Sequence, residues 1–110
     1  MAQNCEILEE LYTTILSRRG GDADKSYTAK LFARGRGKIA QKFGEEAVET
    51  VVAALAEGRD ELASESADML YHLLVLWAEC GIEPGRVWAE LERRLGTSGI
   101  DEKKSRAKKG

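Results

Sequence analysis

ADMLYHLLVLWAEC, residues 67–80, is the stretch that decides the fold. Apolar residues cover nearly every side of a helix drawn through it, and a helix that is apolar all round is normally buried. When the helix is extended back from this stretch to residue 61, five of its polar residues share one side, because on a helix that turns about 100° per residue they lie within about 60° of one another. They are Glu61, Glu65, Asp68, His72 and Glu79. The stretch therefore predicts a buried helix that carries one narrow polar stripe.

The rest of the chain is typical of further helices, and no strand pattern is found. Residues 4–18 and 26–32 have helical character, the second with Ser26 as N-cap. Glycine-rich ARGRG (33–37) predicts a flexible, cationic break before a helix from about Lys38 to Ala56, which ends at Gly58. Asp60 is expected to cap the helix that reaches Cys80 and stops at Gly81. A last helix is expected between Pro84 and Gly96. We therefore expect one all-α domain over residues 1–96 and a mobile basic tail over 97–110.

Composition narrows the class of protein. The 110 residues suffice for one domain, and a net charge of −2 gives no basic field of the kind nucleic-acid binders usually show. The start, MAQNCEILEE, does not resemble a signal peptide, and the most apolar run is shorter than the roughly 20 residues that span a bilayer. Cys5 and Cys80 are far apart without CxxC spacing, so we expect two buried or partly buried thiols in a reducing compartment. The expectation is a cytoplasmic protein with no nucleic-acid or membrane partner.

GEEAVET, residues 44–50, places Glu45, Glu46 and Glu49 together with no base among them. Like charges four residues apart repel by a few tenths of a kcal/mol, so a positive partner is expected. Gly44 lies inside the same helix, where glycine costs about 1 kcal/mol relative to alanine. Either a backbone or a ligand approaches closely there, or the glycine relieves packing.

An antiparallel hairpin of the two long helices, joined at residues 58–60, would face these acids toward Glu65 and Asp68. Such acids must pair with bases or hold a cation, and the lysines of the first helix are too few to neutralise them all. A site with carboxylates and at most one imidazole suits a hard cation, magnesium or manganese, rather than zinc. His72 follows Asp68 by four, which does not fit the Glu-x-x-His of di-iron bundles. His72 is either a packed, hydrogen-bonded residue or a ligand or base.

Basic residues precede the acids along the chain. Lys38 and Lys42 share the stripe of the carboxylates near a helix N-terminus, where the dipole favours anions. Lys30, Arg34 and Arg36 come just before them. Acids for a metal and bases for phosphate together indicate chemistry at the phosphoanhydride of a nucleotide. The alternative for the bases is a solvated cationic loop.

The pattern EExxE, fifteen residues, then ExxD resembles the all-α nucleotide pyrophosphohydrolase superfamily, which includes MazG-type enzymes and dimeric dUTPases. A longer match is more specific. SYTAKLFARGRGKIAQKFGEEAVETVVAAL (26–55) followed by ESADMLYHLLVLWAECGI (65–82) resembles the phosphoribosyl-ATP diphosphatase family. This resemblance extends over residues 7–95.

The resemblance implies magnesium-dependent hydrolysis of the α–β phosphoanhydride of phosphoribosyl-ATP, the second step of histidine biosynthesis, to phosphoribosyl-AMP and pyrophosphate. It implies metal ligands at Glu46, Glu49, Glu65 and Asp68. Glu45 would be an additional acid, behind the ligands or orienting the attacking water, and which of Glu45, Glu46 and Glu49 is the base stays open. It also implies phosphate contacts from Lys38 and Lys42 and a substrate-site lining of Ser26, Tyr27, Thr28 and Lys30.

A hairpin with one helix apolar on nearly every side cannot cover itself in so short a chain. We therefore expect a homodimer in which the hairpins pair as a four-helix bundle with flanking helices outside, as the resemblance also implies. Two other functions stay open: a related pyrophosphohydrolase of standard or damaged nucleoside triphosphates, and a non-catalytic helical interaction module.

Overall fold

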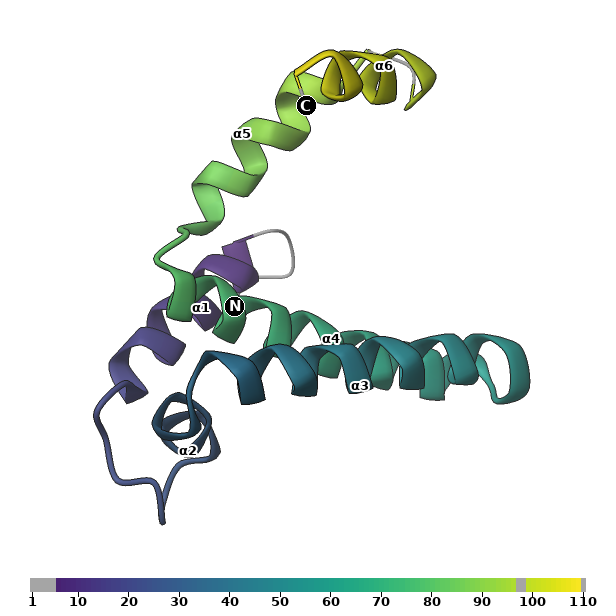
Figure 1. Cartoon of the computed structure of the whole chain (residues 1–110). Coiled ribbons are helices and arrows are strands. Elements are labelled where there is room, and N and C mark those ends of the chain that lie inside the picture. Colours follow the sequence, from purple (N-terminus) through teal and green to yellow (C-terminus); the bar gives the residue numbers. More distant parts are fainter. Residues whose placement is uncertain (1–5, 97–98, 110) are drawn as a thin grey trace.

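The two longest helices, α3 (Arg36–Ala56) and α4 (Arg59–Cys80), form an antiparallel hairpin that positions the rest of the chain (Figure 1). The computed structural model describes residues 6–96 and 99–109, and in these two ranges every regular element is a helix. The other helices are α1 (Glu6–Arg18), α2 (Tyr27–Arg34), α5 (Pro84–Arg94) and α6 (Gly99–Lys109). The predicted all-α class and the hairpin are confirmed.

The turn of the hairpin differs from the prediction at the start of α4. Gly58, in an extended conformation, is the N-cap residue, and α4 begins at Arg59. Asp60 is therefore not the cap, as predicted, but lies with Glu61 in the first turn. Both carboxylates interact favourably with the helix dipole there without bonding to an end N–H group as a cap would.

The junction between α2 and α3 is tighter than the predicted flexible break. Only Gly35 is non-helical, with a φ of 92° that favours glycine, and its N–H donates to the carbonyls of Leu31 and Phe32. The long helix begins at Arg36, two residues before the predicted Lys38. One residue with a positive φ is enough to change the chain direction, so residues on both sides stay helical. Ser26 caps α2 as predicted, since its Oγ accepts from the Ala29 N–H at 3.1 Å.

The hydrophobic core lies at the open end of the hairpin, where α1 and α2 pack against α3 and α4. Its buried residues are Tyr12, Ile15, Leu31, Ile39, Leu74, Val75 and Ala78. The Tyr12 hydroxyl donates to the Ile82 carbonyl at 2.9 Å, which ties α1 to the end of α4. The apolar helix α4 is thus buried mainly in its C-terminal half, and Leu70 stays partly exposed.

The C-terminal helices extend away from the hairpin (Figure 1). Gly81 ends α4 with a φ of 73°, and α5 begins at Pro84 as predicted. The Trp88 indole donates to Glu9 at 2.7 Å and meets Trp77 edge-on, so α5 is attached at its first turns. Gly99–Lys109 form α6, a helix that the sequence analysis does not predict. Asp101 near its start and basic Lys104 and Arg106 further on match the helix dipole, which favours this helix. The mobility of the tail stays a prediction.

Two further predictions concern the thiols and the membrane. Cys80 is a free thiol but exposed, so the prediction of a buried or partly buried side chain is wrong for it. It follows the last buried turn of α4 at the end of the helix, where the chain turns outward. Cys5 lies outside the described residues. No described helix is long and apolar enough to cross a bilayer.

Replacing Ile39 by alanine tests the position of the core. Ile39 is fully buried, so the substitution should lower the free energy of unfolding by about 2–5 kcal/mol through lost burial and a cavity. Ile7, which is 50% exposed on α1, is the matched control, and Ile7→Ala should cost less than about 1 kcal/mol. Urea unfolding at one protein concentration measures both. Equal losses would contradict this placement of the core.

Candidate metal-binding site

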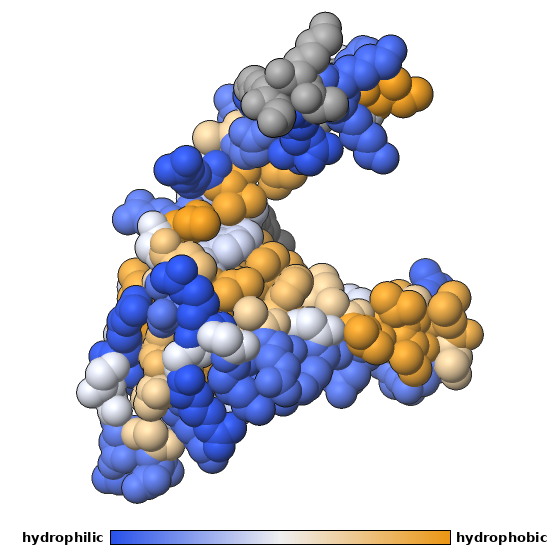
Figure 2. All heavy atoms as spheres, in the orientation of Figure 1, coloured by the Kyte–Doolittle hydropathy of each residue, from blue (hydrophilic) through white to orange (hydrophobic). Residues whose placement is uncertain are grey.

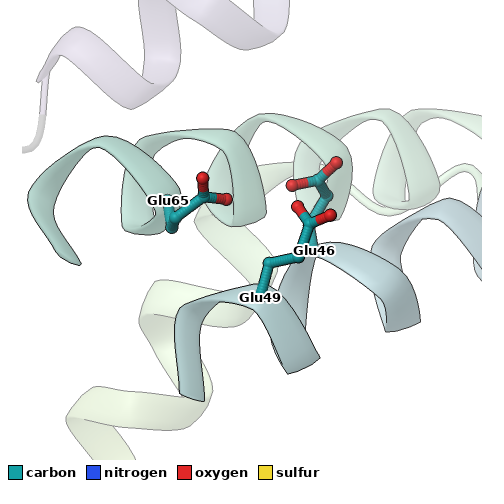
Figure 3. A group of neighbouring side chains, drawn as sticks. All are labelled: Glu46, Glu49 and Glu65. Atoms are coloured by element: carbon teal, nitrogen blue, oxygen red, sulfur yellow. The ribbon is translucent and has the colours of Figure 1, made fainter. Parts of the chain in front are cut away.

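Three carboxylates converge between the two helices of the hairpin (Figure 3). Glu46 and Glu49 lie one turn apart on α3, so they share a face, and the antiparallel pairing brings Glu65 of α4 opposite them. Each offers one carboxylate oxygen, and these three oxygens lie within 4.8 Å of one another. The structure thus brings together three of the four predicted metal ligands.

Thr50 joins the two helices beside this cluster, and the sequence analysis missed it. Its hydroxyl oxygen lies 2.8 Å from the Glu46 carbonyl, one turn back on α3, and 3.2 Å from the Glu65 carbonyl on α4. The contact holds the two backbones at the level of the acids. A threonine one turn after a glutamate does not by itself predict a contact between helices, because the contact with the Glu65 carbonyl depends on how α3 and α4 pair.

The cluster holds more negative charge than nearby groups compensate. One oxygen of Glu46 and one of Glu65, both Oε2, are buried and have no hydrogen-bond partner in the described structure. Burial, the neighbouring Glu49 and the charges of Asp68 and Glu65 raise the pKa of Glu46 to about 7. Burial, with the charges of Glu49 and Asp68, also raises the pKa of Glu65. Buried carboxylate oxygens without a partner are costly, and oxygen donors of this kind are the ones that magnesium binds.

Asp68, the fourth predicted ligand, lies outside the group of three. Its side chain is exposed, one turn further along α4 than Glu65. Its charge nevertheless acts on Glu46 and Glu65, so it belongs to the same acidic surface.

Glu45 does not join the cluster, although it is adjacent to Glu46. It accepts hydrogen bonds from Gln41 at 2.8 Å and from Lys42 Nζ at 3.2 Å. These bonds, with the charges of Lys42 and Lys38, lower the pKa of Glu45, whereas the pKa values of Glu46 and Glu65 are raised. The EExxE and ExxD motifs together hold five acids. Glu45 is compensated by Lys42 and Gln41, Glu46, Glu49 and Glu65 form the cluster between the helices, and Asp68 lies exposed beside it.

The segment SYTAK, residues 26–30, packs against α4 rather than lying free. Thr28 is buried, with its hydroxyl bonded to the Tyr71 hydroxyl. The Tyr27 hydroxyl lies 3.1 Å from His72 Nε2. His72 is buried and hydrogen-bonded on both ring nitrogens, as the first of the two interpretations predicted. Ser26 is occupied as the helix cap.

The remaining predicted bases are not gathered at the three carboxylates. Lys30 and Arg34 are exposed on α2, and neither forms an ion pair in the part of the chain that the structure describes. Arg36 lies 3.9 Å from Glu79, which also pairs with Arg19 at 3.3 Å. Arg19 further donates to the Ala78 carbonyl at 3.0 Å. The sequence analysis missed Arg19, because its partners are about 60 residues away along the chain.

An all-α hairpin with EExxE on one helix and ExxD on the next, and with their glutamates converging, is the architecture of the α-helical nucleotide pyrophosphohydrolases. Comparison with known proteins specifies the family. A family model described as "Phosphoribosyl-ATP pyrophosphohydrolase" matches residues 8–95. The chain belongs to this family, which confirms the resemblance found in the sequence.

Several relatives are each named "Phosphoribosyl-ATP pyrophosphatase". One from Paramagnetospirillum magneticum is 83% identical over 99% of this chain and 100% of the relative. One from Rhodospirillum rubrum is 64% identical over 94% of this chain and 88% of its own length. One from Parvibaculum lavamentivorans is 51% identical over 99% of this chain and 100% of the relative. These similarities confirm the prediction that the chain is a hydrolase of this family.

The raised pKa of Glu46 predicts how the metal-free chain responds to pH. An acid whose pKa rises on folding, from 4.5 to about 7, binds its proton more tightly in the folded state, so stability falls as pH rises through that range. Allowing for solvent screening of this partly exposed group, we expect a loss of about 1 kcal/mol between pH 5 and 7.5. Thermal unfolding in the presence of a chelator measures this loss.

Glu49→Gln should reduce the loss, because it removes the charge that acts on both Glu46 and Glu65. Glu45→Gln is the matched control and should not reduce it, since the pKa of Glu45 is shifted downward. An equal pH dependence in the wild type and Glu49→Gln would contradict the assignment.

Proposed function

We propose that this chain hydrolyses the α–β phosphoanhydride of phosphoribosyl-ATP, giving phosphoribosyl-AMP and pyrophosphate in the second step of histidine biosynthesis. The observation that carries the proposal is the family match over residues 8–95, which includes both helices that bear the converging carboxylates. A multiply charged substrate does not cross membranes unaided, so the proposed place of action is the cytoplasm.

The proposal includes a magnesium ion, with manganese as a possible substitute. Glu46, Glu49 and Glu65 offer three oxygens within 4.8 Å of one another, and Asp68 would supply a fourth carboxylate. The two buried oxygens without partners support a cation there. When bound, magnesium polarises the attacked phosphoryl group and lowers the pKa of a bound water.

The chain's own bases would bind the phosphates. Lys42 is fixed by Glu45, and this hydrogen bond raises the pKa of Lys42, which keeps the ammonium charged. Lys38 lies one turn earlier on α3, and the proposal also includes Lys30, Arg34 and Arg36, which are exposed before it. Positive charge beside the departing pyrophosphate is effective, because phosphoryl transfer depends mainly on positioning and electrostatics. One of Glu45, Glu46 and Glu49 accepts the proton of the attacking water.

Product analysis tests the reaction directly. The purified protein is incubated with phosphoribosyl-ATP, with and without magnesium, beside a panel of nucleoside triphosphates. We expect magnesium-dependent formation of phosphoribosyl-AMP and pyrophosphate in equal amounts. Turnover of the panel without turnover of phosphoribosyl-ATP would favour the related nucleoside triphosphate pyrophosphohydrolase. Absence of all turnover would favour a non-catalytic interaction module.

Removing one carboxylate of the cluster tests the metal site. Glu49→Gln should lower kcat/KM by at least about 100-fold, because the ligand is lost while the shape is kept. It should also lose most of the stabilisation that magnesium gives to the wild type in thermal unfolding. Glu61→Gln, one turn before Glu65 on α4, removes a charge outside the cluster and should change both quantities little. A variant Glu49→Gln with full activity would exclude this site.

We further propose that the chain is a homodimer in which two hairpins pair as a four-helix bundle. Apolar side chains are exposed on one stripe of α3, and hydrophobic atoms gather toward the far end of the hairpin (Figure 2). Their exposed fractions are 62% for Val48, 57% for Val51, 46% for Val52 and 84% for Leu55. Contiguous exposed apolar surface of this kind is typical of a protein interface.

Gly44 supports the same interface. It lies one turn before Val48 on this stripe, and a Cβ built there would meet no atom within 4 Å. Packing inside one chain therefore does not explain the glycine, whereas close approach of a second hairpin would.

Placing a charge in the stripe tests the dimer. Val51→Glu should convert the protein to a monomer, since burial of an unpaired carboxylate would oppose association. Lys103→Glu, which places a glutamate on the exposed surface of α6 outside the hairpin, is the control and should leave the dimer intact. Sedimentation equilibrium measures the mass of both. A monomeric wild type at micromolar concentration would contradict the proposal.

A further inference from the structure

His72 is held in one orientation by contacts on every side. Its side chain is only 5% exposed, and each ring nitrogen faces one partner. Nδ1 lies 2.8 Å from the Asp68 carbonyl oxygen, and Nε2 lies 3.1 Å from the Tyr27 hydroxyl. The rings of Tyr71 and Tyr27 both pack edge-on to the imidazole, with centroids at 4.9 and 5.8 Å.

These partners decide where the protons lie. A carbonyl oxygen only accepts hydrogen bonds, so Nδ1 of His72 carries the proton that it donates to Asp68. In the neutral imidazole the other nitrogen, Nε2, is then an acceptor. The Tyr27 hydroxyl must therefore donate its proton to His72. The phenol oxygen of Tyr27 keeps its lone pairs and can only accept from a further partner.

Tyr27 is placed to use that acceptor for a ligand. The residue is 50% exposed at the start of α2, while its ring stacks on Tyr71 at 6.2 Å with an interplanar angle of 28°. Tyr71 is in turn bonded to Thr28, so α2 is fixed to α4 at two points. The ring and the hydroxyl of Tyr27 are thus both held against α4, while half of the residue stays exposed to a ligand.

We propose that His72 is a positioning residue that turns the Tyr27 hydroxyl proton inward, so that Tyr27 accepts a hydrogen bond from a ribose hydroxyl of the substrate. This inference rests on the proposed function. Ionised phosphate oxygens only accept hydrogen bonds, so a phenol whose proton is donated to His72 cannot serve them. Ribose hydroxyls donate, and they fit the acceptor that His72 leaves on Tyr27. The pair recognises the sugar, whereas the lysines recognise the phosphates.

The test separates sugar from phosphate by using the two products as ligands. Affinities for phosphoribosyl-AMP and for pyrophosphate are measured by calorimetry with magnesium at pH 8, where histidine is ordinarily neutral. Tyr27→Phe removes the acceptor, and His72→Asn keeps a donor toward Asp68 but no longer reaches Tyr27. Each should weaken phosphoribosyl-AMP binding roughly threefold to tenfold, the range of one hydrogen bond, and leave pyrophosphate binding within about twofold.

The double variant and the kinetics separate positioning from a merely structural role. Tyr27→Phe with His72→Asn should bind phosphoribosyl-AMP no more weakly than either single variant, since both remove the same contact. With phosphoribosyl-ATP as substrate, KM should rise in each variant while kcat changes little. Tyr71→Phe, which removes the neighbouring hydroxyl contact to Thr28, and Tyr12→Phe, which removes the bond to Ile82, are the controls. Both should lower the melting temperature without selective loss of phosphoribosyl-AMP affinity.

Three results would overturn the inference while leaving the proposed function intact. They are an unchanged phosphoribosyl-AMP affinity in folded Tyr27→Phe, a loss of pyrophosphate affinity as large as that for phosphoribosyl-AMP, and multiplicative losses in the double variant. A wild-type protein that neither binds nor hydrolyses phosphoribosyl-ATP would instead overturn the proposed function, and the inference with it.

Discussion

The repulsion among Glu46, Glu49 and Glu65 is the constraint on which the arrangement of the hairpin depends. Two helices that placed only these carboxylates against each other would separate or rotate, because like charges at short range destabilise the pair. The two helices are held together by packing contacts on both sides of the cluster. Ile39, Leu74 and Val75 are fully buried at the open end. Toward the turn, Ala53 is almost fully buried, and its small side chain lets α3 and α4 approach closely.

Packing energy and electrostatic cost are therefore separated along the same two helices. The C-terminal half of α4 contributes the core, whereas its N-terminal half carries Glu65 and Asp68 and buries little apolar surface. Thr50 lies at the level of the acids, where its hydroxyl contacts the carbonyls of Glu46 and Glu65 and so fixes the backbones where the side chains repel. A rigid scaffold next to repelling carboxylates is what the proposed cation site would require, since its ligands would already be in place before the ion binds.

Local signals predicted most of the fold. Helical periodicity predicted the hairpin. The chemistry of single residues at helix ends predicted that Ser26 caps α2, that α4 stops at Gly81 and that α5 begins at Pro84. The same kind of signal failed at Asp60, because a carboxylate fits the first turn about as well as the cap. Sequence signals also failed to predict α6, because this polar, charged segment forms a helix without the apolar periodicity by which a helix is recognised.

The site was predicted as a set of residues but not in its internal pairing. The spacing of Glu46, Glu49 and Glu65 on two helices was enough to predict their convergence. Periodicity cannot tell which acid turns toward a neighbouring base, so the pairing of Glu45 with Lys42 and Gln41 emerged only from the structure. Contacts between segments that are far apart in the sequence could not be predicted from helical periodicity either. Tyr27 and His72 are 45 residues apart in the sequence, and Arg19 and Ala78 are 59 apart.

The proposed dimer and the proposed metal site would be physically coupled through α3. Gln41, Gly44, Glu45, Val48 and Glu49 line one open concave surface on this helix. Glu49 is exposed in the single chain, so water still solvates its carboxylate. A second hairpin covering Val48 would remove part of that water and raise the cost of the charge on Glu49. A cation at the cluster offsets this cost, so ion binding and association would each favour the other, as thermodynamic linkage requires. In the proposed dimer, the apolar stripe would thus exclude water from the acidic cluster, and the proposed ion would offset the electrostatic cost of that exclusion.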